Sequence, residues 1–401
     1  MARSTPLVGL AVMLFACVTG CNSWETPAPP MGAAGGGGAG GSVPDAVYPP
    51  DPAGLHVVGN RIMDAAGDAL VLRGVNRSGT EYECVNGAGI FDGPSDEASI
   101  VAMTTWNINA VRVPLNESCW LGINGVSPAL SGEKYRDAIL LYVNLLHKYH
   151  LTPILELHWT AAGTDLAKDT QQPMPDADHA PAFWSGVASA FLDDTGVVFE
   201  LFNEPFPDSN HDTDKAWACW RDGCVADTAG PAAATSPTFQ AVGMQDLVTA
   251  VRATGATQLI LLGGVEYSNE LSQWQSHAPT DSLNNFAPAW HIYNYNGCRD
   301  ATCWSSVLTD SMALGTQFPI VVTEIGEDDC QATFIDPLMG LLDAHGNGYL
   351  AWSWNSNGRP CAPAGPGGAG SPYQLIKDYA SGTPNSDYAQ GFMDHLAAVS
   401  P

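Results

Sequence analysis

Short apolar runs, each bounded by Gly, Pro or polar residues, recur along the chain between residues 70 and 354. They are rich in Val, Ile and Leu, and their length is typical of strands that are buried on both faces. Apolar residues at helical spacing separate most of them, as in residues 96–106, 139–146, 180–192 and 244–251. The predicted strands are residues 70–75, 110–114, 152–158, 197–204, 258–262, 289–293, 320–324 and 348–354.

Eight buried strands that alternate with helices predict an α/β fold, the (β/α)8 TIM barrel. Two short strand-like segments within residues 55–74, broken at Gly59-Asn60, predict a β-hairpin before the barrel. A helix is predicted at the end of the chain, over residues 387–399. We therefore expect one catalytic domain that covers residues 55–401.

The run at residues 197–205 (VVFELFNEP) ends abruptly in an amide, a carboxylate and a proline. Pro205 has no N–H for a strand ladder, so the strand should end there and place Glu204 at the carboxyl edge of the barrel. Residues 319–326 (PIVVTEIG) have the same design and carry Glu324. A single glutamate at a strand end usually only caps the strand or faces solvent. Two of them at one rim favour paired acid and base chemistry.

Other polar and aromatic side chains interrupt the apolar strands near their predicted ends. Taken singly, a buried Arg can pair with a structural acid, a His can be a satisfied core residue, and a Trp can serve packing. Together they would give one rim two carboxylates, a cation, two imidazoles and aromatic platforms, the combination that sugar hydrolysis needs. These side chains are Arg112, His158, Asn203, His291, Tyr293, Trp352 and Trp354.

From about Leu70 to Trp354 the chain resembles glycoside hydrolase family 5, the cellulase-like barrel enzymes of clan A. The Asn-Glu-Pro triplet alone is a weak signal, but its order and spacing with the other matching segments are specific. The segments are residues 72–79 (LRGVNRSG), 110–114 (AVRVP), 155–159 (LELHW), 202–205 (FNEP), 291–293 (HIY), 323–326 (TEIG) and 351–354 (AWSW).

The resemblance implies a retaining mechanism in which Glu204 is the general acid/base and Glu324 is the nucleophile. Arg112 should keep Glu324 ionised, because an opposite charge lowers the pKa of a carboxylate. Tyr293 can donate to the same carboxylate. Among the tryptophans, Trp352 fits the family's position better than Trp354. The supporting residues that the resemblance implies are Arg112, His158, Asn203, His291, Tyr293, Trp352 and Trp354.

We expect a β-linked polysaccharide or oligosaccharide as the substrate, endo-β-1,4-glucanase activity, and a monomer. Other specificities of the family stay open: β-mannanase, xyloglucanase, β-1,3-glucanase or exo-β-glycosidase. A non-catalytic sugar-binding lipoprotein is the alternative outside the enzymes, and the retained pair Glu204 and Glu324 argues against it. The resemblance implies no metal site and no organic cofactor.

The first 21 residues have the pattern of an export signal. Arg3 precedes an apolar run at residues 7–18 that is too short to span a bilayer comfortably. Residues 18–21 (VTGC) resemble a bacterial lipobox, in which Cys21 is lipidated and becomes the mature N-terminus. Residues 22–54, rich in Pro, Gly and Ala, then predict a flexible tether.

We therefore expect an exported bacterial lipoprotein that is attached to a membrane only through this lipid anchor. A secreted protein with an ordinary cleaved signal is the alternative. Mass spectrometry of the mature N-terminus distinguishes the two, because only the lipoprotein would begin with a modified Cys21.

The formal net charge of −27 comes from 42 acidic and 15 basic residues and argues against binding to nucleic acid or to anionic lipid surfaces. Eight cysteines remain beyond Cys17 and Cys21, and an even number in an exported chain predicts disulfides rather than a zinc site. Although the sequence alone allows many pairings, their positions suggest Cys84–Cys119, Cys219–Cys224, Cys298–Cys303 and Cys330–Cys361.

Overall fold

The computed structural model describes residues 47–227, 238–310, 312–365 and 370–399. The expected signal segment, Cys21 and residues 22–46 of the expected tether lie outside them. Residues 47–54, which the composition also assigns to the tether, contact the folded domain. The N–H of Tyr48 donates to Asn144 Oδ1 at 2.8 Å, and that of Gly54 donates to the carbonyl of Thr195 at 3.0 Å. The compact unit therefore begins at Val47.

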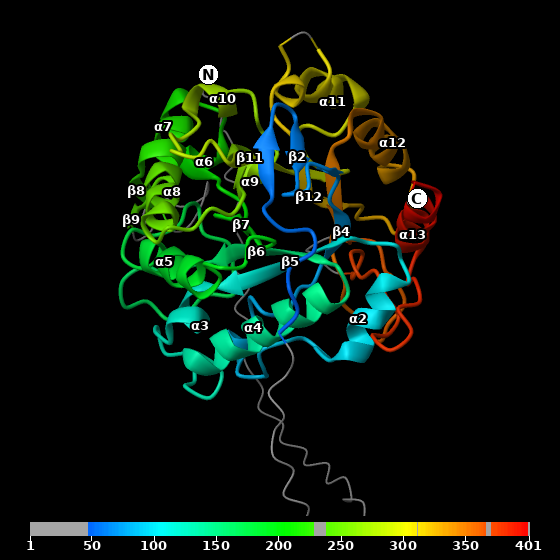
Figure 1. Cartoon of the computed structure of the whole chain (residues 1–401), viewed down its shortest axis with the longest axis horizontal. Coiled ribbons are helices and arrows are strands. Elements are labelled where there is room, and N and C mark those ends of the chain that lie inside the picture. The colour runs from blue at the N-terminus through cyan, green and yellow to red at the C-terminus, as the bar shows by residue number, and fades with distance from the viewer. Residues whose placement is uncertain (1–46, 228–237, 311, 366–369, 400–401) are drawn as a thin grey trace, which may run out of the picture. The chain divides into compact units, whose positions relative to one another are not determined.

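Eight parallel strands close into a barrel, which confirms the predicted (β/α)8 fold (Figure 1). The strands are β4 (Arg73–Asn76), β5 (Ala110–Asn116), β6 (Thr152–Trp159), β7 (Val198–Glu200), β10 (Ile260–Gly263), β11 (Phe286–Tyr293), β12 (Val321–Gly326) and β13 (Gly348–Ala351). They pair in chain order, and the ring closes where β13 pairs with β4. Glycine is required at Gly74 of β4, because a Cβ there would lie 1.9 Å from the carbonyl oxygen of Ala110.

Helices surround the barrel, with α7 and α8 on one side of Figure 1 and α12 and α13 on the other. The predicted helices are confirmed within a few residues at each end. The helices are α1 (Glu83–Asn86), α2 (Glu97–Thr104), α3 (Glu117–Leu121), α4 (Glu133–Lys148), α5 (Ala180–Ala190), α6 (Pro207–Asn210), α7 (Asp214–Asp222), α8 (Met244–Ala253), α9 (Val265–Ser268), α10 (Trp274–His277), α11 (Ala301–Leu308), α12 (Ile335–His345) and α13 (Asp387–Val399), with a 3-10 turn at Leu314–Thr316. Within the described ranges, no helix combines the length and apolar character that crossing a bilayer requires.

A three-stranded antiparallel sheet covers the amino-terminal end of the barrel: β1 (His56–Val58), β2 (Arg61–Met63) and β3 (Ala69–Leu70). The predicted hairpin is β1 and β2. Leu70 pairs with β2 rather than opening the first barrel strand, so that strand begins three residues later than predicted. Leu55 and Ile62 pack against residues at the starts of the barrel strands, such as Ala110 and Val198. This end of the barrel is therefore closed and apolar, and the polar residues gather at the other end.

Two barrel strands end earlier than their apolar runs predict. β7 ends at Glu200, so Asn203 and Glu204 lie on the segment that follows it. The residues after Glu200 turn toward the rim and keep only isolated backbone hydrogen bonds to the neighbouring strands. One of these runs from the Asn203 N–H to the carbonyl of Leu157 at 3.0 Å. β13 ends at Ala351, which likewise places both predicted tryptophans beyond the strand.

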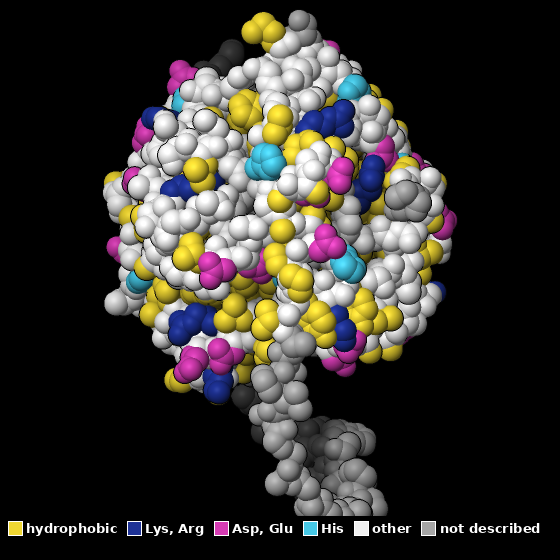
Figure 2. Space-filling model, in the orientation of Figure 1, with side chains coloured by type: hydrophobic (Ala, Val, Ile, Leu, Met, Phe, Trp, Pro, Cys, Tyr) yellow, Lys and Arg dark blue, Asp and Glu magenta, His cyan; other side chains and the backbone are white. Residues whose placement is uncertain are grey.

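The described Lys and Arg side chains on the face drawn in Figure 2 stand apart from one another rather than forming a stripe. Some of the described cations pair with carboxylates of the same chain. Arg73 Nη2 lies 2.7 Å from Asp343 Oδ1, and Arg252 Nε lies 2.9 Å from Asp281 Oδ1. Such internal pairs leave fewer positive charges for an external polyanion.

Four disulfides confirm the predicted pairing of the cysteines: Cys84–Cys119, Cys219–Cys224, Cys298–Cys303 and Cys330–Cys361. Two of them close short loops in which the cysteines are 5 residues apart. The other two close loops of 35 and 31 residues and tie together segments from different βα units. They should constrain the unfolded chain more strongly than the short ones.

We therefore expect the loss of unfolding free energy in disulfide variants to increase with the length of the loop that the disulfide closes. Replacing Cys84 and Cys119 by Ala opens a 35-residue loop, and we expect the free energy of unfolding to fall by about 4 kcal/mol. The matched control, in which Cys219 and Cys224 become Ala, opens a 5-residue loop and should lose about 2 kcal/mol. Denaturant unfolding of the non-reduced domain measures both values. An equal or larger loss in the control would contradict the loop-length argument.

Candidate active site

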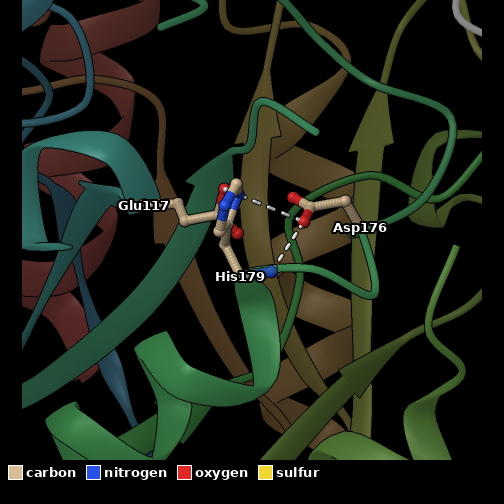
Figure 3. Close-up of side chains that lie close together, drawn as sticks. All are labelled: Glu117, Asp176 and His179. Carbon is tan, nitrogen blue, oxygen red and sulfur yellow. Dashed lines mark hydrogen bonds and ion pairs between the residues drawn. The ribbon is translucent and has the colours of Figure 1, made fainter. Parts of the chain in front are cut away.

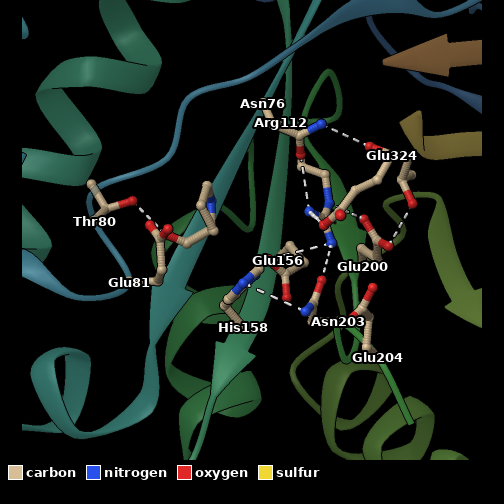
Figure 4. Close-up of polar contacts among 12 residues, drawn as sticks. Asn76, Thr80, Glu81, Arg112, Glu156, His158, Glu200, Asn203, Glu204 and Glu324 are labelled. Carbon is tan, nitrogen blue, oxygen red and sulfur yellow. Dashed lines mark hydrogen bonds and ion pairs between the residues drawn. The ribbon is translucent and has the colours of Figure 1, made fainter. Parts of the chain in front are cut away.

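The guanidinium of Arg112 lies at the centre of the polar group at the carboxyl ends of the strands (Figure 4). It is fully buried. Its Nε donates to Glu200 Oε2 at 2.6 Å, and its Nη1 donates to Glu324 Oε1 at 2.8 Å. Nη1 also donates to Asn76 Oδ1, and Nη2 donates to Asn203 Oδ1, both at 2.9 Å. One side chain from β5 thus joins residues of β4 and β12 with residues at and beyond the end of β7.

Carboxylates around this guanidinium keep it charged. Burial by itself would lower the pKa of Arg112. The negative charges of Glu156, Glu200 and Glu324 raise it above its usual value instead. For Glu200 the balance is reversed: burial would raise its pKa, but Arg112 together with His291 holds that pKa below its usual value. The centre of the rim is a buried network of opposite charges.

The two expected catalytic carboxylates, Glu204 and Glu324, face each other across the rim. Glu324 belongs to β12 and is 4% exposed, whereas Glu204 is partly exposed. A carboxylate oxygen of one lies within 4.8 Å of a carboxylate oxygen of the other. His291 Nδ1 lies 2.9 Å from Glu204 Oε1 and 3.6 Å from Glu324 Oε2. The imidazole therefore contacts both carboxylates from one side.

Both oxygens of Glu324 accept hydrogen bonds. Arg112 donates to Oε1, and the Tyr293 hydroxyl donates to Oε2 at 2.6 Å, so both expected contacts are present. Burial and the charge of Glu324 raise the pKa of Tyr293 well above its usual value, so the hydroxyl keeps the hydrogen that it donates. Donors on both oxygens fix the direction of this carboxylate.

His291 is a buried cation at neutral pH. Burial would lower its pKa, but the charge of Glu324 and the hydrogen bonds to Glu200 and Glu204 raise that pKa to about 10. Its other nitrogen, Nε2, lies 3.1 Å from Thr323 Oγ1, and Thr323 in turn donates to Glu200 Oε1 at 2.9 Å. The histidine thus connects the acid at the rim with the charges beneath it.

The amide of Asn203 has a fixed orientation. Because its oxygen accepts from Arg112, its Nδ2 must point the other way, where it lies 3.5 Å from His158 Nε2. His158 is held from below by Glu156, whose Oε2 lies 2.8 Å from Nδ1. Burial lowers the pKa of His158, which favours the neutral ring. The donor that a ligand would meet at this corner of the rim is therefore the uncharged Asn203 Nδ2.

The two predicted tryptophans have different surroundings. The ring of Trp352 stacks on His158 with centroids 5.5 Å apart and an angle of 9° between the planes. Trp354 is fully buried, and its ring meets Trp106 at 5.0 Å in the apolar layer outside the strands. The structure therefore brings Trp352 into the site and places Trp354 in the core.

Sequence analysis assigns no contact in the site to several residues that the structure brings there. Gln171, on the loop between β6 and α5, donates from its Nε2 to Glu204 Oε2. Asn76, Glu200 and Thr323 fall inside the matching segments or apolar runs, but nothing in the pattern assigns them a contact. The one signal that could have found Glu200 is a charged residue in the middle of an apolar strand, since such a charge needs a partner.

The raised pKa of His291 makes a prediction for the pH dependence of stability. A histidine has a pKa of about 6.5 when unfolded. Because the pKa of His291 is about 10 in the folded protein, its contribution is complete below pH ~6.5 and is lost as the pH rises through about 10. We expect His291→Gln to lower the Tm most below pH ~6.5 and progressively less toward pH ~10, as measured by thermal unfolding of both proteins.

The control for this experiment is His158→Gln. Burial lowers the pKa of His158, so its neutral form is the one that folding favours, and its contribution should be lost as the pH falls. The two variants should therefore show opposite trends. A difference in Tm for His291→Gln that stays constant from pH 6 to pH 10 would refute the assignment of a buried imidazolium.

Comparison with known proteins agrees with this geometry. The family described as Cellulase (glycosyl hydrolase family 5) matches residues 63–358 of the chain. A mannan endo-1,4-beta-mannosidase from Streptomyces lividans is 25% identical over 316 residues, which cover 76% of this chain and 67% of that protein. One of the same name from Salipaludibacillus agaradhaerens is 21% identical over 314 residues, covering 76% and 82%.

Solved structures share the fold. A beta-glucanase from Saccharophagus degradans in complex with cellotetraose has a TM-score of 0.60 at 18% identity, and the match covers 90% of this chain and 100% of that one. The catalytic domain of a mannanase from Streptomyces sp. SirexAA-E has a TM-score of 0.57 at 19% identity, covering 90% and 95%. Because the family match spans well over half of the sequence, the chain belongs to glycosyl hydrolase family 5 and is a glycoside hydrolase.

Proposed function

We propose that this protein is a retaining endo-β-1,4-glycanase that cleaves a polysaccharide by double displacement. The observation that supports the mechanism is the approach of the two carboxylates, with oxygens of Glu204 and Glu324 within 4.8 Å of each other. Retaining glycosidases keep their two carboxyl groups ~5 to 5.5 Å apart, whereas inverting ones need ~6.5 to 9.5 Å for an intervening water.

In the first step, Glu324 attacks the anomeric carbon while Glu204 gives its proton to the departing glycosidic oxygen. The bond from carbon to the leaving oxygen breaks as the bond from carbon to Glu324 forms. In the second step, Glu204 takes a proton from water, and that water displaces Glu324 with a second inversion. Arg112 and Tyr293 hold both oxygens of Glu324, which aims the attacking carboxylate.

The roles differ because the environments differ. Glu324 is buried, bound on both oxygens and next to a fixed guanidinium, which suits a group that acts as an anion. Glu204 is more exposed and accepts hydrogen bonds from the side chains of Gln171 and His291, which suits a group that exchanges a proton with substrate and water. Asn203 Nδ2 can donate to the sugar 2-hydroxyl, and the ring of Trp352 can pack against a pyranose face.

The named relatives favour β-1,4-mannan as the polysaccharide. Both are called mannan endo-1,4-beta-mannosidase, and each match covers 76% of this chain. The preference for β-1,4-glucan that the sequence pattern suggests is the second candidate. The two polymers differ at the sugar 2-hydroxyl, which is axial in mannose and equatorial in glucose, and Asn203 is the residue that we propose binds that hydroxyl.

Variants of the two carboxylates test the mechanism. Glu204→Gln should slow hydrolysis of the polysaccharide by about 10²- to 10⁴-fold, because the leaving oxygen is no longer protonated. It should spare the first step on an aryl β-glycoside whose leaving group needs no proton. Glu324→Ala should abolish that first step on both substrates. The exposed Glu97, which pairs with Lys148 at the end of α4, supplies the control Glu97→Gln, which should behave as wild type. NMR of the first product would show inversion if the double displacement is wrong.

A product profile tests the substrate. The purified protein should release short oligosaccharides from β-1,4-mannan faster than from a soluble β-1,4-glucan, and the chain length of the polymer should fall before monosaccharide accumulates. Faster cleavage of the glucan would reverse the order of the two candidates. Release of only monosaccharides or disaccharides from chain ends would exclude endo action, and binding without any reducing-sugar release would support the non-catalytic alternative.

A further inference from the structure

A second cluster of ionisable side chains lies outside the group around Arg112 (Figure 3). Glu117 opens α3 just after β5, Asp176 lies on the loop before α5, and His179 is the residue that precedes α5. One carboxylate oxygen of each acid and one ring nitrogen of the histidine all lie within 4.8 Å of one another. Both acids are fully buried, and the His179 side chain is 22% exposed. The cluster is thus buried but can be reached from solvent through the imidazole.

Each acid has one oxygen that is held by the backbone and one that has no partner. Glu117 Oε1 accepts from the N–H of Ala161 at 3.2 Å. Asp176 Oδ1 accepts from the N–H groups of Asp178 and His179 at 3.0 and 2.8 Å. Glu117 Oε2 and Asp176 Oδ2 are buried without any hydrogen-bond partner. Capping and loop closure therefore explain the first oxygen of each acid but not the second.

Positive charge near these two acids is scarce. Among the described residues, the ion pairs of Glu117 and Asp176 involve only His179, whose Nδ1 lies 3.8 Å from Glu117 Oε1 and 3.5 Å from Asp176 Oδ1. An unpaired buried carboxylate oxygen is costly, and buried charges normally pair with a cation or coordinate a metal.

We propose that Glu117, Asp176 and His179 form a binding site for one divalent transition-metal ion, with Zn²⁺ as the preferred ion. Two carboxylate oxygens and one imidazole nitrogen suit Zn²⁺, whereas Ca²⁺ prefers oxygen ligands throughout. With a metal bound, the ring of His179 carries its proton on Nε2 and presents Nδ1. The carbonyl oxygen of Ala161, 3.2 Å from Nδ1, is positioned as a fourth ligand.

Such an ion would fix the loop between β6 and α5. Glu117 belongs to α3, while Asp176 and His179 belong to the far end of that loop, so the metal would tie the loop to the preceding βα unit. The same loop carries Gln171, which donates to Glu204. The proposed site is structural. The ion would fix the loop that carries Gln171, the hydrogen-bond donor to Glu204, and would not contact the reacting atoms.

The test uses the full mature protein after exhaustive dialysis against a chelator. Zn²⁺, Mn²⁺ and Ca²⁺ are titrated separately by calorimetry, and the Tm is measured with and without each ion. We expect one Zn²⁺ per chain, weaker binding of Mn²⁺ and little of Ca²⁺. At a hundredfold excess over Kd, Zn²⁺ should raise the Tm by about 4 °C for a domain of this size.

Variants locate the binding. Glu117→Gln and His179→Gln each remove a ligand and should weaken Zn²⁺ binding more than about 100-fold, beyond the effect of substituting an outer-shell partner. If Glu117→Gln does not fold, the partly exposed His179→Gln still gives the answer. The matched control is His395→Gln, which removes a histidine paired with the single carboxylate of Asp343 and should bind Zn²⁺ as wild type does.

Two results would overturn the proposal. One is the absence of saturable Zn²⁺ binding together with an unchanged Tm, which would mean that the two buried acids share a proton instead. The other is Zn²⁺ binding that survives in His179→Gln but is lost in Glu204→Gln, because His291 with the two catalytic carboxylates is the other described group whose atoms lie close enough to hold an ion.

Discussion

The structure of the rim depends on one buried cation, the guanidinium of Arg112. Taking a charged group out of water is costly unless it is paired and hydrogen-bonded, and here its nitrogens reach two carboxylates and two amides from three barrel segments. Because the guanidinium is planar, these partners are held at fixed angles to one another. This guanidinium sets the orientation of the Asn203 amide and, together with the Tyr293 hydroxyl, the direction of Glu324.

The inside of the barrel is divided into two unlike halves. At the amino ends of the strands, Ile62 of the small antiparallel sheet and Leu55, which precedes that sheet, complete an apolar plug. At the carboxyl ends, charged and neutral polar side chains form a hydrogen-bonded network around Arg112. Apolar packing at the amino ends stabilises the barrel without polar groups. The polar residues at the carboxyl ends are therefore free to serve the reaction.

Much of this could be predicted from the sequence, for identifiable reasons. Strands buried on both faces produce apolar runs in the sequence, and the surrounding helices produce a periodic pattern. The eight strands and the main helices could therefore be predicted. Glu204 and Glu324 stood out because each follows such a run. Gln171 did not, because its contact depends on the path of a loop. In the cluster of Glu117, Asp176 and His179, Glu117 lies 59 and 62 positions before the other two residues, and no local pattern predicts that contact.

The ends of strands were the least predictable feature. Residues 197–202 are apolar apart from Glu200, which predicts a strand over the whole run. β7 nevertheless ends at Glu200, because the chain then leaves the strand ladder and turns toward the rim. Trp352 and Trp354 have the same spacing that would put two strand residues on one face, but β13 ends before them, and their rings go to different places. The alternation of side chains predicts which face a residue occupies only as far as the strand itself continues.

The contacts of Tyr48 and Gly54 have a consequence for access to large substrates. Asn144 lies near the end of α4 and Thr195 just before β7, so the chain enters the domain at the pole of the barrel opposite Glu204 and Glu324. A glycan chain that crosses the rim therefore does not meet residues 47–54.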